Sequence, residues 1–174
     1  MSPTPVSAGD LLTALPDYAE MLEACVADGA SIGFLHPMPA GQAETFWRDV
    51  AQGVAAGDIL MWSVLEADGA VAGTIQLHPV GKPNGAHRAE IAKLMVHPRA
   101  RGRGLAVALM RTAEDAARAL GRRLLVLDTI EGSVADRLYR RLGWTEAGVI
   151  PDFALKSGGG SEPTVVFWKR LPAV

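Results

Sequence analysis

Apolar residues recur at helical spacing in two segments near the start of the chain. Residues 17–29 and 43–57 each place their apolar side chains on one face, with Asp17 as a candidate N-cap and Gly29 and Gly57 as stop signals. The residues that form these two stripes are Tyr18, Met21, Leu22, Cys25 and Val26, then Ala43, Phe46, Trp47, Val50 and Val54. The pattern predicts two amphipathic helices ahead of the main sheet.

The middle of the chain alternates between β-rich runs and turn signals. Residues 59–65 and 71–77 are separated by a turn that contains Asp68-Gly69, which predicts an antiparallel hairpin. Residues 89–96 form a third run, expected in the same sheet. Residues 123–128 hold a continuous apolar run, which is typical of a central strand buried on both faces.

Helical stripes follow the third and fourth runs. The first spans residues 105–120, and the second begins after Gly132-Ser133 and ends at Gly143. A strand, a helix and a strand in succession predict a parallel, right-handed crossover. Residues 144–150 and 164–168 predict two last strands, joined by a flexible connection at residues 156–163.

Composition and charge narrow the functional class. The chain has 174 residues, 49% of them apolar and 21% charged, which favours one globular domain. A net charge of −2 argues against a nucleic-acid partner. Without a long apolar run or a basic leader followed by an apolar core, we expect no membrane partner and a cytoplasmic location. The one cysteine, Cys25, is expected to be a buried thiol rather than a nucleophile.

Arginines gather in one part of the chain, which suits a small polyanionic ligand. For those beyond Arg103, the alternative is that they only solvate helix faces. The cluster comprises Arg99, Arg101, Arg103, Arg111, Arg118, Arg122, Arg123, Arg137, Arg140 and Arg141.

The start of this cluster predicts an anion cradle. The strand at residues 89–96 runs through Pro98 into Arg99-Ala-Arg-Gly102-Arg-Gly104 and directly into a helix. Backbone amides and the positive end of the helix dipole then converge on one spot, and the glycines let the backbone approach a pyrophosphate. A Walker loop is absent, and a dinucleotide fingerprint would need glycine at Val107.

This loop resembles the Arg/Gln-x-x-Gly-x-Gly/Ala signature of the GCN5-related N-acetyltransferase superfamily. Residues 87–96, 125–129, 132–133, 138–139 and 150–154 are similar to the branch that includes tabtoxin-resistance acetyltransferases. The resemblance implies an α/β fold with a mixed, twisted sheet of six to seven strands, helices on both faces, and acetyl-CoA between splayed fourth and fifth strands. It also implies a helical acceptor-side region (1–57), a sheet core that binds acetyl-CoA (58–142) and a C-terminal hairpin (143–174).

The same resemblance assigns the cofactor contacts and expects no metal. Arginine side chains of the loop should reach phosphate oxygens, although the sequence does not say which one points inward. The residues expected to contact acetyl-CoA are Leu94, Met95, Val96, Arg99, Arg101, Gly102, Arg103, Gly104, Leu105, Ala106 and Ser133.

Three residues are candidates for catalysis. Tyr139 matches the family's frequent general acid; the alternative is a core tyrosine. Glu90 opens the fourth strand as a candidate base, or else pairs with Arg88. Asp128 ends the fifth strand as a second carboxylate, or else caps the next helix. His97, before Pro98, is expected to be structural.

The predicted activity is acetyl transfer from acetyl-CoA to a primary amine of a small molecule, by direct attack in a ternary complex. The alternative is a CoA-binding regulatory or stress module without turnover. Family members are often dimers, yet no feature of the sequence identifies an interface, and the amine and acyl preference stay open. Candidate acceptor-side residues, most of whose aromatics are expected in the core, are Phe34, Trp47, Trp62, Gln76, Asp152 and Phe153.

Overall fold

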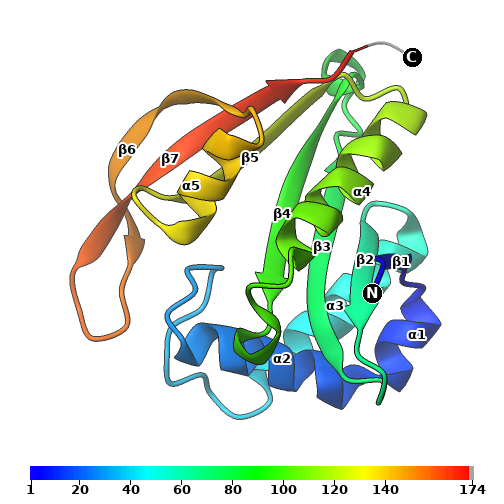
Figure 1. Cartoon of the computed structure of the whole chain (residues 1–174), viewed down its shortest axis with the longest axis vertical. Coiled ribbons are helices and arrows are strands. Elements are labelled where there is room, and N and C mark those ends of the chain that lie inside the picture. The colour runs from blue at the N-terminus through cyan, green and yellow to red at the C-terminus, as the bar shows by residue number, and fades with distance from the viewer. Residues whose placement is uncertain (173–174) are drawn as a thin grey trace.

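The fold is built on one mixed sheet of seven strands, seen in a computed structural model that describes residues 1–172. The strand order is β1-β2-β3-β4-β5-β7-β6 (Figure 1). The strands are β1 (Thr4–Pro5), β2 (Leu60–Leu65), β3 (Val71–Pro79), β4 (Arg88–Val96), β5 (Leu124–Ile130), β6 (Thr145–Leu155) and β7 (Ser161–Arg170). The helices are α1 (Ala8–Thr13), α2 (Leu15–Ala27), α3 (Gln42–Ala56), α4 (Leu105–Ala119) and α5 (Val134–Arg141), with short 3-10 turns η1 (Pro83–Gly85) and η2 (Pro98–Ala100).

The predicted α/β architecture is confirmed. β2, β3 and β4 pair antiparallel in sequence, and β4 and β5 pair in parallel across the α4 crossover. Figure 1 shows α4 and α5 in front of the sheet, and α2 and α3 on its other side. Each side has its own core: α4 and α5 cover one that contains Leu109 and Phe167, while α1 to α3 cover one that contains Trp47 and Met95.

β4 carries a bulge that changes which face its side chains occupy. Ala92 pairs with Gln76 and Met95 pairs with Thr74, so β4 has one more residue than β3 over this interval. The extra residue coincides with Lys93, whose φ of 50° is unusual outside glycine. Ile91 therefore packs under α4, whereas Met95, four residues later, packs under α2 and α3.

β4 and β5 stay together over three residue pairs and then separate. The pairs are Arg88 with Leu124, Ala89 with Leu125 and Glu90 with Val126. Figure 1 shows the two strands diverging from this meeting point, β5 with β7 on one side and β4 with β3 on the other. The predicted splay is thus present.

The splay also explains one wrong prediction. β5 is not buried on both faces: Leu125 and Leu127 are buried, but Asp128 is exposed. The strand borders the gap, so only its face toward α5 is covered by the core.

The chain termini differ most from the predicted elements. A Ser7–Asp10 capping box begins the unpredicted α1, and α2 follows from Leu15, so Asp17 lies in the first turn of α2 and is not its N-cap. β1 was also not predicted. The last two strands extend beyond the predicted ranges and leave only residues 156–160 as their turn.

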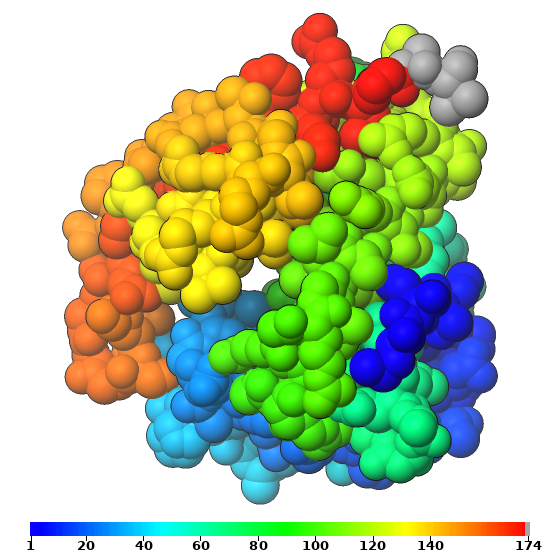
Figure 2. Space-filling view, viewed as in Figure 1, coloured from blue at the N-terminus to red at the C-terminus, as the bar shows by residue number. Residues whose placement is uncertain are grey.

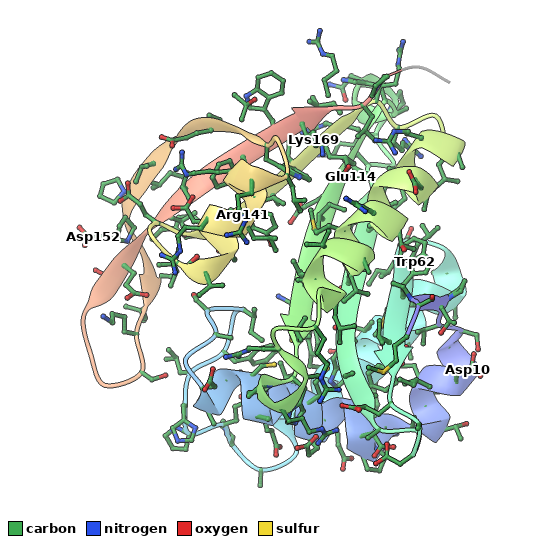
Figure 3. The ribbon with its side chains drawn as sticks, in the orientation of Figure 1. Asp10, Trp62, Glu114, Arg141, Asp152 and Lys169 are labelled. Carbon is green, nitrogen blue, oxygen red and sulfur yellow. The ribbon has the colours of Figure 1, made fainter. Side chains whose placement is uncertain are left out.

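A buried ion network lies beside the paired segment of β4 and β5, which is the closed end of the gap between these two strands. Lys169 Nζ donates to both Glu114 carboxylate oxygens, at 2.8 and 2.9 Å, and to Leu142 O at 2.8 Å. Trp144 Nε1 also donates to Glu114, at 3.2 Å. Figure 3 shows Glu114 on α4 and Lys169 on β7 on the same side of the molecule. The network links α4, β7 and the segment that follows α5.

The fold predicts a strict requirement for glycine at position 73. A Cβ there would lie 2.8 Å from Met95 O and 3.2 Å from Leu109 Cδ1, between β4 and α4. Gly73→Ala should lower the free energy of unfolding by about 1–3 kcal/mol, because backbone must shift to admit the methyl group. Urea unfolding measures this loss.

Gly81→Ala is the matched control, because a Cβ at Gly81 meets open space. It should change the free energy of unfolding by less than about 0.5 kcal/mol. Equal losses in both variants would contradict the packing argument.

Candidate active site

The gap between β4 and β5 leaves strand backbone without a strand partner. β4 continues to Val96, but its pairing with β5 stops at Glu90. Figure 2 shows a hollow on the surface between the yellow segment around α5 and the green segment of β4 and early α4. Unpaired strand edges bind extended, amide-containing ligands, because the ligand can supply the missing hydrogen bonds.

A row of free backbone amides lies where β4 leads into α4. Gly102 and Gly104 both have a φ of 77°, which turns successive N–H groups toward one side. Within residues 1–172, the amides of residues 102–107 donate no hydrogen bond, and the first helical bond is Ala108 N to Gly104 O. Free amides at a helix N-terminus are the arrangement that an anion cradle requires, and the cradle itself stays a prediction.

The loop arginines point to acidic partners. Arg101 pairs with Asp28, and Arg103 Nη1 lies 3.2 Å from Glu66 Oε2. Arg99 Nη1 lies 3.8 Å from Glu20 Oε2. The backbone of this loop, rather than its side chains, is therefore the part that is free to bind a phosphate, and the predicted arginine contacts stay predictions.

Strand pairing puts both candidate carboxylates on one face of the sheet. Glu90 pairs laterally with His78 on β3 and with Val126 on β5, and Asp128 follows Val126 by two residues. Neither Glu90 nor Asp128 forms an ion pair with any residue the structure describes, so the Arg88 alternative is not realised. The N-cap of α5 is Ser133, not Asp128. Both carboxylates remain available to a ligand.

Tyr139 combines a core ring with an accessible hydroxyl. Its ring centroid lies 6.0 Å from those of Trp144 and Phe167. The Tyr139 hydroxyl forms no hydrogen bond within residues 1–172. In the same residues, the polar side-chain atoms that are both fully enclosed and without a partner are Gln76 Nε2 and Arg122 Nε. The Tyr139 hydroxyl is not one of them, so it has some contact with solvent. Burial, and then the charge of Asp128, raise the Tyr139 pKa. The hydroxyl thus stays protonated within the electrostatic reach of Asp128.

The other residues predicted to contact the cofactor differ in which of their atoms a ligand in the gap can reach. The side chains of Leu94 and Val96 pack on the α4 core, and Met95 faces the α2 side, so each can meet a ligand in the gap mainly through its backbone. Leu105 and Ala106 open α4. Ser133 Oγ accepts from Asp136 N at 3.1 Å and lies at the N-terminus of α5.

One residue of this face escaped the sequence prediction. Lys93 lies on β4 between Glu90 and the cradle, and its Nζ donates to Ile32 O at 2.9 Å. The signal that could have identified it is a lysine inside an otherwise apolar run, Ile91-Ala-Lys-Leu-Met-Val96. Such a position requires either a bulge or a functional reason.

The candidate acceptor residues separate into three groups. Trp47 is fully buried under α2, and Trp62 is buried in the α4 core, so both are structural. Phe34 packs edge-on against Phe46 at 5.1 Å, and Gln76 is buried on the face of the carboxylates. Asp152 and Phe153 are exposed on β6, where Figure 3 shows Asp152 at the outer edge of the sheet.

Cys25 and His97 have structural surroundings. Cys25 is buried, and burial raises the pKa of its thiol to about 11, which removes it as a nucleophile. His97 Nδ1 accepts from Arg99 N at 3.2 Å, and His97 Nε2 lies 3.0 Å from Glu20 Oε1. In the part of the chain that the structure describes, no group of three or more His, Cys, Asp or Glu residues could hold a metal ion.

A pocket of about 390 Å³ lies at the closed end of the gap between β4 and β5, away from the residues predicted to bind the cofactor or to catalyse. It is lined by Met110, Arg111, Glu114, Arg141, Leu142, Gly143 and Lys169. Glu114 and Lys169 already satisfy one another there, and none of the predicted site residues reaches it. The candidate catalytic and cradle residues lie instead toward the end where β4 and β5 have separated.

Over residues 1–172, no helix has the length and apolar character needed to span a bilayer.

Comparisons with known proteins agree with this arrangement. A family model described as "Acetyltransferase (GNAT) family" matches residues 27–144. A GCN5-related N-acetyltransferase from Kribbella flavida superposes with a TM-score of 0.77 at 24% identity, covering 98% of each chain. A phosphinothricin acetyltransferase from Sinorhizobium meliloti, in complex with acetyl-CoA, gives 0.79 at 19%, covering 98% of this chain and 88% of the other. An N-acetyltransferase from Staphylococcus aureus gives 0.78 at 17%, covering 99% and 100%.

The site predicts an unusual alkaline titration. Burial raises the pKa of both tyrosines, Tyr18 and Tyr139, above the usual value of 10. Native protein should therefore show less phenolate absorbance at pH 10.5 than unfolded protein, in which most of both phenols are ionised. Because the unfolded state loses these protons first, the tyrosine contribution to stability is complete below pH 10 and declines as pH rises above it. Ultraviolet titration without and with urea measures phenol ionisation in the native and in the unfolded protein. Ionisation of the native tyrosines near pH 10 would contradict the burial argument.

Proposed function

The chain belongs to the GNAT acetyltransferase family, and we propose that it transfers the acetyl group of acetyl-CoA to a primary amine of a small molecule. The observation that carries the proposal is the gap after Glu90 and Val126, with free amides at one end and two unpaired carboxylates on one face. One end suits a pyrophosphate and the other suits an ammonium group. We further propose that both substrates bind together and that the amine attacks directly.

Binding of the donor follows from the backbone. The amides of residues 102–107 would receive the pyrophosphate, and the unpaired edge of Leu94 to Val96 would pair with the pantetheine arm. Ser133 stands at the N-terminus of α5, across the gap. Acetyl-CoA supplies an activated thioester, and the protein supplies its position.

Glu90 and Asp128 would act on the amine. A carboxylate without an internal ion pair attracts an ammonium group and can take its proton, directly or through water. The neutral amine then forms the new carbon–nitrogen bond as the carbon–sulfur bond breaks, and the nitrogen gives up its second proton to solvent to leave a neutral amide. N–H groups of the β4 edge would stabilise negative charge on the carbonyl oxygen during this step.

Tyr139 would act on the departing sulfur. Its raised pKa keeps the phenol protonated at neutral and mildly alkaline pH, so the hydroxyl can donate a hydrogen bond there. The same shift makes it a weaker acid than a free phenol, so its main contribution is a hydrogen bond that strengthens as charge builds on sulfur. The proton follows, and solvent restores the phenol through the gap.

A contact across the acceptor side supports a small amine. His36 N donates to Ser157 Oγ at 2.7 Å, which joins the α2–α3 loop to the β6–β7 turn. The loop also meets β4, through Lys93 Nζ and Ile32 O. These contacts surround the carboxylate face with chain segments from three regions, an arrangement that favours a compact acceptor over a protein surface.

The direct test is acetyl-CoA-dependent thiol release in the presence of a panel of small amines, with calorimetry for CoA binding. Turnover with at least one amine supports the proposal. CoA binding without amine-dependent release would favour a module that binds CoA and has no turnover. Absence of CoA binding would overturn both functions.

The cradle predicts a selective effect of Gly104→Ala. Gly104 has a φ of 77°, which residues with a Cβ rarely adopt, so alanine there would strain the turn that positions the free amides. The dissociation constant for acetyl-CoA should rise about 10-fold or more, because phosphate contacts depend on close backbone approach. Isothermal calorimetry measures the change.

Gly121→Ala supplies the control for Gly104. Gly121 follows α4, has a φ of 69°, and also faces open space. Both substitutions should cost about 1 kcal/mol of stability, but only Gly104→Ala should weaken acetyl-CoA binding. Equal dissociation constants for acetyl-CoA in the two variants would contradict the assignment of the cradle.

The proposed leaving-group role predicts the effect of Tyr139→Phe. The ring packing is kept while the hydroxyl is lost, so kcat should fall about 10²-fold or more with little change in stability. Tyr18→Phe is the matched control, because Tyr18 is also buried but its hydroxyl donates to Ser63 Oγ at 3.0 Å, away from the gap. Steady-state kinetics compare the two. An unchanged kcat in a folded Tyr139→Phe variant would show that Tyr139 does not act on the leaving group.

A further inference from the structure

Lys93 is aimed by the β4 bulge into the face that carries Glu90 and Asp128. Its backbone occupies the left-handed region at φ 50°, which costs free energy for a residue with a Cβ. Ala92, its neighbour, pairs with Gln76, and Glu90 pairs with His78, so these side chains share that face. The bulge thus adds a cation beside the two proposed amine-binding carboxylates.

The Lys93 ammonium group is only partly compensated by the protein. Nζ donates to Ile32 O and lies 5.7 Å from the centroid of the Phe46 ring. In residues 1–172, no carboxylate oxygen lies within 4.0 Å of it. Burial lowers the Lys93 pKa, while the more distant charges of Asp128 and Glu90 oppose that shift. A half-buried cation with two unused N–H groups calls for an acceptor.

The neighbouring polar groups add donors rather than acceptors. Gln76 is buried, and its Nε2 has no hydrogen-bond partner within the described chain, while its Oε1 is used by His78 Nε2 at 2.9 Å. Burial, and then Lys93, lower the His78 pKa, so this ring is neutral at pH 7. The face therefore has surplus N–H groups near Lys93 and surplus carboxylate oxygens at Glu90 and Asp128.

We propose that Lys93 is a specificity residue that binds an anionic group of the acceptor, so that the preferred acceptors carry a carboxylate or similar anion as well as the amine. This inference rests on the proposed acetyl transfer. Glu90 and Lys93 are three positions apart on one strand, or about 10 Å at the usual rise per residue, so one short molecule can reach both. The ammonium end faces the carboxylates, and the anionic end faces Lys93.

The alternative role for Lys93 is structural, because its bond to Ile32 O fastens the α2–α3 loop to β4. A purely structural lysine would affect all acceptors alike. The informative quantity is therefore a ratio: kcat/KM for an amine with a carboxylate, divided by kcat/KM for the same amine with a neutral carboxamide.

The experiment compares wild type and Lys93→Met on amino acids and the corresponding carboxamides. Wild type should prefer the carboxylate about 10-fold or more, and Lys93→Met should reduce the ratio to near one, since methionine keeps the stem and removes the charge. Lys82→Met is the control, because Lys82 is an exposed lysine in the loop before β4 and should leave the ratio unchanged.

A second measurement uses a short carboxylic acid without an amine, such as butyrate. It should inhibit competitively against the amine but not against acetyl-CoA, and Lys93→Met should lose this inhibition. A ratio near one in wild type, or a ratio that survives in Lys93→Met, would overturn the role of Lys93 while acetyl transfer stands. Normal acetyl-CoA binding with no turnover of any amine would overturn both proposals.

Discussion

The pairing of β4 with β5 over only three residue pairs is the constraint on which the rest of the site depends. A central strand edge without partners leaves donors and acceptors unsatisfied, which a stable sheet normally avoids. Here the closed end is held by the buried Glu114–Lys169 pair and by Trp144, which fix α4 to the C-terminal strands. With that end fixed, the two strands can separate while the sheet stays intact, and the freed edge of β4 is the surface proposed to bind the donor.

The one-residue bulge in β4 is the second feature on which the proposed site depends. A regular strand would place Ile91, Lys93 and Met95 on the same face, which would put a lysine into the α4 core. The extra residue restores an apolar set on the α4 side, Leu94 and Val96, and turns Lys93 toward α2 and α3. One backbone irregularity thus separates the proposed donor-binding side of the sheet from the polar acceptor side.

The parts that could be predicted from sequence are those with local signals. The hairpin at Asp68-Gly69, the α4 stripe and the Arg/Gly loop each carry their own pattern, and the structure has all three. The register of β4 against β3 depends on packing by α2 and α3, so the sequence marks Lys93 as unusual in an apolar run but does not show which face of the sheet it occupies. The apolar run of β5 likewise gave no sign that the strand borders a gap, so it was taken as buried on both faces although Asp128 is exposed.

Charge balance at the cradle also depends on contacts that lie far apart in sequence. The arginine-rich loop indicates a positive phosphate site, yet its arginines meet Glu20 and Asp28 of the α2 region and Glu66 of the β2–β3 turn. Exposed pairs of this kind add little stability individually, but together they hold the loop from two sides. The free amides are then fixed in place before a ligand arrives, which reduces the entropy lost on binding. The arginine side chains therefore fasten the loop whose backbone carries the free amides.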